Sequence, residues 1–427
     1  MILTLQRSYN CERIAHRSGK SGRSVVLRYS TPDRANALEN PINLGMIENI
    51  IEHFESLPDP RREHPNTLHK LIDIVVIALC ATIAKADTWE EIEDYGNAKE
   101  GFLSQFLELP HGIPSHDTFN RVFARLNPDA WQSCFTQWMA SIGSSKIGEL
   151  IAIDGKTLRA SKATGTGKSE EEQAALVMLS AWASERQIVL DQLPVDDKKN
   201  EISVIPSLLS NLDLEGATVS IDAMGCQKAI AKQIIKQGGD YLLSLKANQE
   251  DIYQEANWLF SYNREEQVPM EHAESFDVAH GREETRSCWL IKDLRILEDT
   301  VKDFDAWHQL TSIIVIDSQV IRKGKTTCQR RFFLSSLDGS AKDALHKVRT
   351  HWSIENQQHY PLDIVFHEDA NRTRKGFAAQ NLAVLRRLAL NLINLHPQPK
   401  VSKRRKRFKA LLDDDYLLQV LGVSLPD

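Results

Sequence analysis

Two aspartates stand where buried strands should still carry apolar side chains. Asp154 follows the apolar residues 151–153 in the stretch IAIDGK, and Asp222 follows Val219 and Ile221 in TVSIDAMG. If the two predicted strands are neighbours in one sheet, both carboxylates emerge at strand ends and converge. Carboxylates in close approach repel unless one takes up a proton or a cation lies between them, and Mg²⁺ prefers carboxylate oxygen. The alternative is that each aspartate only caps the turn after its strand.

A third acid of this kind is Glu355, in the stretch HWSIENQQHYPLDIVFHED. The residues before it predict a helix on which three apolar side chains recur in line with the acid, at a spacing of three or four: Leu345, Val348 and Trp352. A carboxylate on such a mainly apolar face points inward, where an unpaired charge is costly. A metal ion would relieve this cost, and a salt bridge to Arg349 is the alternative.

The elements that must position these acids change in character along the chain. Residues 46–147 predict helices separated by loops rich in Pro, Gly and Asn. After Gly148, three apolar, β-branched runs predict a three-stranded meander, which is followed by helix, strand, helix and strand. This order describes a mixed sheet with helices on its faces. Open α/β sheets place their sites at the C-terminal ends of adjacent strands, so Asp154 and Asp222 would meet there.

The predicted helical region contains a candidate DNA-contacting helix. The stretch IPSHDTFNRVFARL, residues 113–126, offers Ser115 or Asp117 as the N-cap and leaves Arg121 and Arg125 facing outward. A recognition helix has this pattern, and so do many ordinary surface helices.

Overall composition restricts the class of protein less than local charge does. The chain of 427 residues carries 52 basic and 58 acidic residues, a net charge of −6, and is long enough for two or three domains. Six scattered cysteines without a CxxC pair predict free thiols in a reducing cytoplasm and argue against zinc. The longest apolar run, residues 71–84, is shorter than the ~20 residues that span a bilayer and contains Asp73, which predicts a buried helix and no membrane partner.

Basic residues cluster in several places. Residues 1–45 hold seven basic and three acidic residues with little apolar periodicity, so we expect a disordered and dispensable extension. Seven of the ten residues 400–409 are basic, which predicts a phosphate-binding patch, with a solvated tail as the alternative. In HGREETR, the two arginines are expected to contact DNA phosphates or to stabilise a hairpin end, with a solvated, charged strand edge as the alternative. The candidate DNA contacts besides Arg121 and Arg125 are Arg282, Arg286, Arg372, Arg374, Lys375, Lys403, Arg404, Arg405, Lys406 and Arg407.

Two further motifs carry no site. The stretch ATGTGKS, residues 163–169, ends like a phosphate-binding loop, but that motif requires glycine where this chain has Lys162. We therefore expect no nucleotide cofactor. The acidic run of residues 413–415 is typical of a solvated segment.

Four stretches together resemble a known family. IAIDGKTLR, VSIDAMGCQKAIAKQIIKQGGDYLLSLKANQ, HGREETR and RTHWSIENQQHYPLDIVFHEDANRTRKGFAAQNLAVLRRLALNLI closely resemble the DDE transposases of bacterial insertion sequences, in the branch that includes the H-repeat-associated proteins. The resemblance covers almost everything from Met46 onward. It implies an RNase H-like fold and a catalytic triad of Asp154, Asp222 and Glu355.

The chain departs from the family pattern at three positions. Tyr360 and Pro361 stand where relatives usually have a Trp and an aliphatic residue, and Ala247 stands where Gly is more usual. A proline there is expected to end or kink the helix, but more than a turn beyond Glu355. All three acids are present, so we expect an intact active site.

The resemblance also implies phosphoryl transfer with two Mg²⁺ or Mn²⁺ ions, ~3.5–4 Å apart, that stabilise the attacking and leaving oxygens. Asp154 would bridge both ions, Asp222 would complete one site and Glu355 the other. Water would free a 3′-hydroxyl at the element's end, and that hydroxyl would attack target DNA. The implied partners are double-stranded DNA and, on DNA, further copies of the chain, in the cytoplasm at the nucleoid. A nuclease that cleaves without joining and an inactive DNA-binding remnant are the alternatives.

The complete prediction is an α/β chain whose RNase H-like mixed sheet with flanking helices is interrupted by a mainly β insertion and preceded by an all-α N-terminal domain. The predicted parts are a disordered basic extension (1–45), a helical DNA-binding domain (46–147), the catalytic core in two pieces (148–248 and 339–397, the second with the Glu355 helix), a β-rich insertion (249–338) and a basic C-terminal tail (398–427).

Overall fold

The computed structural model of the chain describes residues 45–62, 67–143, 146–162, 174–195, 200–279 and 281–422. Almost all of the predicted N-terminal extension and the glycine-rich stretch 163–169 lie outside these ranges, so the expectations about them stay predictions. No helix within the described ranges is long and apolar enough to cross a bilayer.

The described residues of the N-terminal region form six helices, which confirms its predicted all-α character. They are α1 Gly45–Glu55, α2 Leu71–Ile83, α3 Trp89–Ala98, α4 Glu100–Leu103, α5 His116–Arg125 and α6 Pro128–Ser141. The apolar run predicted to be a buried helix is α2, in which even Asp73 is buried. Local sequence fixes several helix starts, because Thr88 and Glu91 form a capping box at α3 and Asn127 caps α6.

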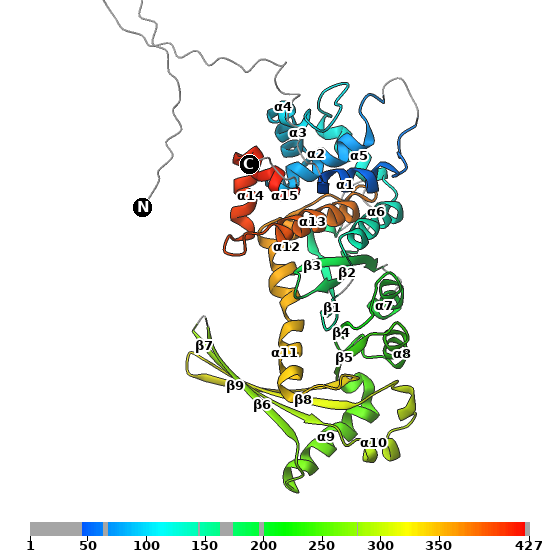
Figure 1. Cartoon of the computed structure of the whole chain (residues 1–427), viewed down its shortest axis with the longest axis vertical. Coiled ribbons are helices and arrows are strands. Elements are labelled where there is room, and N and C mark those ends of the chain that lie inside the picture. Colours follow the sequence, from blue (N-terminus) through cyan, green and yellow to red (C-terminus); the bar gives the residue numbers. More distant parts are fainter. Residues whose placement is uncertain are drawn as a thin grey trace, which may run out of the picture. The chain divides into compact units, whose positions relative to one another are not determined.

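A single mixed sheet runs through the rest of the chain, with the strand order β3-β2-β1-β4-β5-β9-β8-β7-β6. The strands are β1 Leu150–Leu158, β2 Leu176–Ala183, β3 Ile188–Val195, β4 Thr218–Ile221, β5 Asp240–Leu245, β6 Glu271–Ala279, β7 Arg282–Ile291, β8 Ser312–Arg322 and β9 Lys325–Ser335. β1, β4 and β5 are parallel, and the other neighbours are antiparallel. The first five strands have the predicted RNase H-like arrangement, and the insertion strands β6–β9 extend the same sheet (Figure 1).

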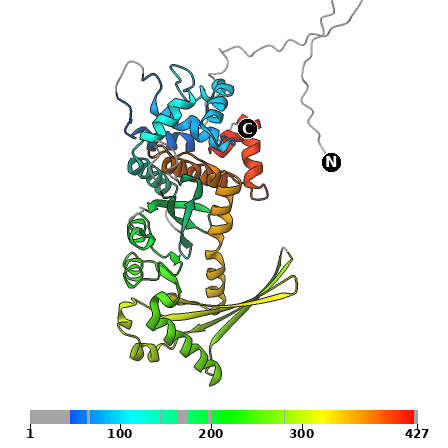
Figure 2. The ribbon, with the colours of Figure 1, turned by 180° about the vertical axis from the view of Figure 1, so that it is seen from behind.

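Helices cover both faces of the first five strands, with α7 and α8 on one face and α11 on the other (Figures 1 and 2). The remaining helices are α7 Glu201–Ser210, α8 Lys228–Lys236, α9 Glu250–Glu265, α10 Arg295–Thr300, α11 Ala341–His351, α12 Tyr360–Ile364, α13 Ala378–Leu395, α14 Lys403–Leu412 and α15 Asp414–Val420. Ile151 and Ile153 enter the apolar cluster under α7 and α8. Since successive strand residues face opposite sides, Asp154 faces the side of α11.

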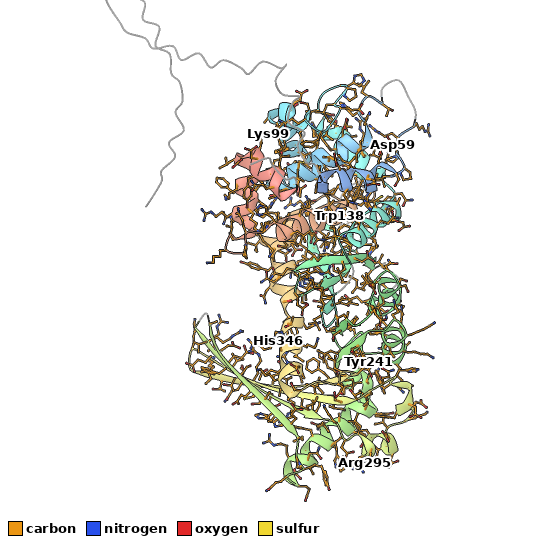
Figure 3. All side chains as sticks on the ribbon, in the orientation of Figure 1. Asp59, Lys99, Trp138, Tyr241, Arg295 and His346 are labelled. Carbon is orange, nitrogen blue, oxygen red and sulfur yellow. The ribbon has the colours of Figure 1, made fainter. Side chains whose placement is uncertain are left out.

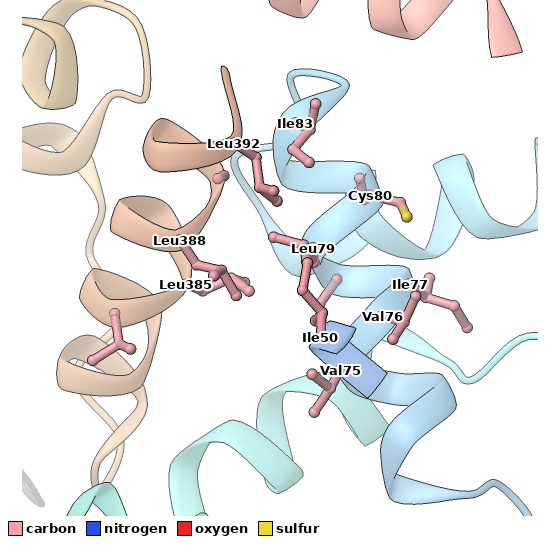
Figure 4. Packing of buried hydrophobic residues seen from close by; sticks show 14 of the residues in the cluster. Ile50, Val75, Val76, Ile77, Leu79, Cys80, Ile83, Leu385, Leu388 and Leu392 are labelled. Carbon is pink, nitrogen blue, oxygen red and sulfur yellow. The ribbon is translucent and has the colours of Figure 1, made fainter. Parts of the chain in front are cut away.

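The long helix α13 joins the helical region to the sheet. Leu385, Leu388 and Leu392 of α13 face the buried residues of α2, among them Val75 and Leu79 (Figure 4). The same apolar cluster includes residues of α1, α5 and α6 and reaches Val189 of β3 and Trp182 of β2. The N-terminal helices therefore share one core with α13 and the first strands of the sheet.

The C-terminal segment predicted as a basic tail is folded. α14 and α15 pack against each other and against α13, because Tyr416, Leu417 and Leu418 are buried in the cluster around α13. The acidic run also has a structural role, since Asp413 accepts a hydrogen bond from the Tyr416 N–H and caps α15 (3.1 Å). Lys99, between α3 and α4, forms a salt bridge with Asp414, the next acid in the run, at 2.7 Å.

Candidate active site

The two predicted aspartates lie on adjacent parallel strands. The pairing of β1 with β4 ends with Ile153 opposite Ile221, so Asp154 and Asp222 are the next residues on the two strands. Asp222 follows the end of β4, as predicted. The prediction of a strand end is wrong for Asp154, because β1 continues to Leu158 by pairing with β2 on its other edge.

A repeated side-chain register brings Glu355 to the same place. Lys347 Nζ on α11 donates to Thr218 Oγ1 on β4 at 3.0 Å, and His351 Nδ1 lies 2.8 Å from Ser220 Oγ. Four helix residues rise ~6 Å and two strand residues rise ~6.6 Å, so each helix step of four matches a strand step of two. The next step along this row reaches Glu355, at the level of the second aspartate.

A widened helical turn directs a further side chain at the acids. Glu355–His359 form a π-helical turn, which α12 continues. His359 Nδ1 lies 3.3 Å from Glu355 Oε2 and 3.8 Å from Asp154 Oδ2, and the ligand atoms of the three residues lie within 4.8 Å of one another. His359 was not among the predicted site residues, although its spacing of four from Glu355 places both on one helix face.

Of the two effects expected of Pro361, an end or a kink of the helix, the first does not occur. Pro361 lies near the start of α12, directly after the π turn. A proline ring crowds the carbonyl four residues earlier and offers no N–H to it, so the wider turn is where the helix accommodates the ring. π turns of this kind are frequent at functional sites. The other unusual residue, Tyr360, is exposed.

The face on which Glu355 lies is more open than its apolar neighbours predicted. The side chain of Glu355 is 52% exposed, and Trp352 is 47% exposed, so the prediction of an inward carboxylate is wrong. The alternative salt bridge to Arg349 does not form either, because that guanidinium pairs with Asp277 at 2.8 Å. The hydrogen bond from His359 lowers the pKa of Glu355 below its ordinary value.

The surroundings of Asp154 disfavour the charged form of its carboxyl group. Burial raises the pKa of Asp154 to about 6; the negative charges of Glu355 and Asp222 act in the same direction, and His359 opposes them. Asp222 is fixed by its turn, since its Oδ1 accepts the N–H groups of residues 224 and 225 at 3.0 and 3.4 Å. A fourth carboxylate approaches from the opposite face, where burial and the charge of Asp222 raise the pKa of Glu201.

These donors fit a divalent metal ion. Mg²⁺ prefers carboxylate oxygen, and Mn²⁺ also accepts imidazole nitrogen beside carboxylates. Burial is the main cause of the raised pKa of Asp154, the negative charges of Glu355 and Asp222 add to it, and a bound cation would favour the charged carboxylate. Asp154, Glu355 and His359 could hold one ion, and Asp222 lies beside them on the next strand.

Comparison with known proteins decides the family. The family described as "Transposase DDE domain" matches residues 146–392, and the family "DDE_Tnp_1-associated" matches residues 51–139. The chain belongs to the DDE transposases. It is 36% identical to "H repeat-associated putative transposase YhhI" of Escherichia coli (strain K12), over 88% of this chain and 99% of that protein. It is 42% identical to "Uncharacterized protein in dhlA 3'region" of Xanthobacter autotrophicus, over 68% of this chain and 96% of that one.

A solved structure shows a weaker likeness to this transposase. The piggyBac transposase synaptic complex with hairpin DNA matches 87% of this chain and 78% of its own, with a TM-score of 0.44 and 11% sequence identity. Such a score carries no argument about the site.

A network of buried ion pairs holds the segment that follows Glu355 against β1. Lys156 is 5% exposed, and its Nζ lies 2.6 Å from Asp363, 3.2 Å from Asp369 and 3.8 Å from Glu368. Glu368 in turn pairs with Arg387 of α13 at 2.8 Å, both fully buried. Sequence reasoning missed Lys156, although it lies two residues after the aspartate of β1 and therefore on the same face of the strand.

A cleft of about 720 Å³ opens beside the acids of this transposase, and Asp222 and Glu355 line it. Strands β7, β8 and β9 of the insertion form its far wall. Two of the predicted DNA contacts, Arg282 and Arg286 of β7, therefore line the cleft as well. Both guanidiniums are paired within the protein, with Glu284 at 3.1 and 2.7 Å respectively.

The other predicted arginines of the catalytic core and the helical region lie at two further clefts. Arg121 and Arg125 face outward from α5, as predicted, and line a cleft of about 990 Å³. Arg372, Arg374 and Lys375 line a third cleft of about 550 Å³. Arg374 also donates from Nε to the carbonyl of residue 160 at 3.1 Å.

Of the five basic residues 403–407, only Arg404 and Arg405 are fully solvent-facing on α14. Lys403 is partly buried and donates from Nζ to Gln357 Oε1 in the π turn at 3.1 Å, and burial lowers its pKa to about 8. Lys406 is 5% exposed, and its Nζ donates to the carbonyls of residues 393 and 396 at 2.8 and 2.9 Å. It caps the end of α13 and is not on the predicted DNA-facing surface.

Arg407 departs furthest from the prediction, because its side chain is 1% exposed. Nε and Nη2 donate to the Thr82 carbonyl at 3.2 and 2.8 Å, and Nη1 donates to the Val365 carbonyl. Its guanidinium stacks on the Phe366 ring at 4.2 Å and reaches Asp87 at 3.3 Å. These carbonyls end α2 and α12, where orphan acceptors need donors. Arg407 therefore joins two helix ends inside the protein.

Proposed function

We propose that this transposase cleaves DNA at the ends of an insertion sequence and transfers the freed strand into target DNA, with Asp154, Asp222 and Glu355 as its catalytic acids. The observation that carries the proposal is the register that brings three acids from distant parts of the chain to one place. β1 and β4 end their pairing just before the two aspartates, and the row of contacts between α11 and β4 leads to Glu355.

The acids would hold divalent ions, Mg²⁺ or Mn²⁺, which when bound stabilise charge on the attacking and leaving oxygens of a phosphodiester. In the first step, the oxygen of water attacks phosphorus, the bond to the 3′-oxygen breaks, and a 3′-hydroxyl and a 5′-phosphate result. In the second step, this 3′-hydroxyl attacks a phosphodiester of target DNA and a new bond joins the strands. The scissile phosphate would reach the acids through the cleft that Asp222 and Glu355 line.

The basic surfaces support a DNA substrate. Arg282 and Arg286 line the cleft that contains Asp222 and Glu355, and the exposed Arg404 and Arg405 lie on α14, whose first residue contacts the π turn. Phosphates could compete with the internal carboxylate partners of the cleft arginines, since both interactions are charge-assisted. Because two element ends must be joined, we propose that the transposase acts as a homo-oligomer on DNA.

Isosteric substitution of the acids tests this function. Cleavage and strand transfer of element-end DNA would be measured in Mg²⁺ for Asp154→Asn, Asp222→Asn and Glu355→Gln. We expect loss of both products with folding and DNA binding retained, because each change removes one charge and keeps the shape. Near-normal activity of a variant would remove that residue from the triad. Cleavage without joined products would favour a nuclease, and no divalent-dependent cleavage by the unmodified protein would favour a DNA-binding remnant.

A further inference from the structure

We propose that His359 is a ligand of the metal site beside the catalytic acids, so that one ion is bound by nitrogen as well as oxygen. The inference rests on the proposed function, because it concerns the same site. It adds a residue outside the three acidic positions and predicts a preference among metals.

The position of the imidazole favours shared coordination. Ligand atoms bound ~2.1 Å from one ion lie about 3–4.3 Å apart, and His359 Nδ1 lies 3.3 Å from Glu355 Oε2 and 3.8 Å from Asp154 Oδ2. The second distance is too long for a hydrogen bond. A hydrogen bond to Glu355 accounts for the first distance but not for the second, whereas one ion between the three groups accounts for both.

The burial of His359 supports the proposal, because a buried imidazole nitrogen is usually bonded to another group. His359 is 5% exposed, and its Nε2 is buried without a hydrogen-bond partner among the described residues. Most of the interaction available to the ring therefore lies on the Nδ1 side, where the carboxylates are. The π turn contributes directly, since it holds Glu355 and His359 at its two ends with both side chains toward β1.

The other histidine of the neighbourhood cannot take this place. His351 faces Ser220 Oγ with Nδ1 at 2.8 Å and serves in the register between α11 and β4. It also lies one full step of four residues before Glu355. His346 lies on α11 five residues before His351 (Figure 3), outside this row of contacts, and is exposed. His359 is thus the histidine whose nitrogen the fold directs at the acids.

Nitrogen coordination has a chemical consequence. Mg²⁺ binds almost exclusively through oxygen and keeps several waters, whereas Mn²⁺ accepts imidazole together with carboxylates. A site with two carboxylate oxygens and one imidazole should therefore bind Mn²⁺ more tightly than Mg²⁺. Removing His359 should weaken binding of Mn²⁺ more than binding of Mg²⁺.

Pulsed electron paramagnetic resonance of the full chain with Mn²⁺, without DNA, tests the proposal directly. An imidazole nitrogen bound to Mn²⁺ gives a ¹⁴N coupling, which ¹⁵N-histidine labelling of the unmodified protein replaces by a ¹⁵N pattern. We expect this coupling in the unmodified protein and in the control His346→Asn, and its loss in His359→Asn. The Kd for Mn²⁺ measured by calorimetry should rise at least ~10-fold in His359→Asn, and the Kd for Mg²⁺ by a smaller factor.

The outcomes separate this inference from the proposed function. Absence of histidine nitrogen coupling in the unmodified protein, where folding of a variant plays no part, would overturn the proposal. Coupling that persists in His359→Asn would overturn it equally. If Asp154→Asn abolishes Mn²⁺ binding while His359→Asn leaves it unchanged, the acids hold the metal alone. In that case the proposed function stands and the role of His359 does not.

Discussion

Arg407 offers a strong test of the difference between a basic residue in the sequence and a basic residue at a surface. The sequence places it in a run of cations that predicts DNA binding, whereas the structure buries it between α2 and α12. The substitution Arg407→Met keeps an unbranched, mainly apolar side chain and removes every donor. A matched control, Arg404→Met, makes the same change three residues earlier on the exposed face of α14.

The expected loss of stability follows from the groups left behind. The Val365 carbonyl loses its donor, and a buried unsatisfied acceptor costs ~1–3 kcal/mol. The Thr82 carbonyl loses two charge-assisted hydrogen bonds and keeps only the N–H of residue 85 at 3.3 Å. Asp87 loses a charged partner at 3.3 Å, and the stacking on Phe366 is lost as well. Together these terms predict a fall in the free energy of unfolding of about 3–5 kcal/mol for Arg407→Met, which is the usual range for breaking a buried ionic contact.

Urea unfolding followed by circular dichroism measures the stability, and DNA binding at several salt concentrations measures the surface charge. Arg407→Met should unfold at much lower urea, and its folded fraction should bind DNA with unchanged salt dependence. Arg404→Met should change the free energy of unfolding by less than ~0.5 kcal/mol and flatten the salt dependence by about one unit of log slope if the residue meets a phosphate. Normal stability of Arg407→Met together with weakened DNA binding would refute the structural role.

Two further predictions concern the surroundings of the site. Lys156→Met leaves Asp363 and Asp369 without their buried cation, so the free energy of unfolding should fall by about 3 kcal/mol; urea unfolding that matches the unmodified protein would show that the network does not dock α12. Burial lowers the pKa of His351 to about 4, below the ~6.5 of an unfolded chain. The unfolded state therefore binds the proton first, and up to about 3 kcal/mol of stability present above pH 6.5 should be lost as the pH falls to 4. His351→Gln should flatten this part of the pH profile, and an equally steep profile would contradict the assignment.

The sequence was most informative where a residue breaks its local pattern. Asp154 and Asp222 stand out because a run of mainly apolar strand residues precedes each of them, and this signal does not depend on tertiary structure. The strand and helix order of the core could likewise be predicted from periodicity. The exposure of Glu355 could not, because it depends on a cleft that the insertion strands form together with the Glu355 helix, over a face that the helix pattern alone marks as apolar.

The basic residues of α14 show a different limit. Lys406 and Arg407 lie in the same basic stretch of sequence as Arg404 and Arg405, so a count of charges along the chain cannot distinguish the two pairs. What separates them is the rotation of the helix against α2 and α13 and the presence of helix ends there. The carbonyl that binds Arg407 belongs to Thr82, which is 325 residues away in the sequence. Such a partner can be found only after the fold is known.

The three acids are held by three different physical constraints, and this difference bears on how the site works. Asp154 lies inside β1, where backbone pairing with β2 continues on one edge after β4 ends on the other. Asp222 is fixed by two backbone N–H groups of its own turn. Glu355 depends on long-range contacts: the row that ties α11 to β4, and beyond the acid the ion pairs of Lys156.

A catalytic constellation needs rigid support for each of its groups, and the two aspartates receive it locally. Glu355 is positioned by side chains on both sides of a π turn, and its carboxylate is half exposed. It is therefore the acid whose position is most open to change on binding of the DNA substrate proposed above. The arginines on the far wall of that cleft are already paired with carboxylates of the insertion, so binding of a phosphate there would alter the charge facing Glu355 without moving either strand of the site.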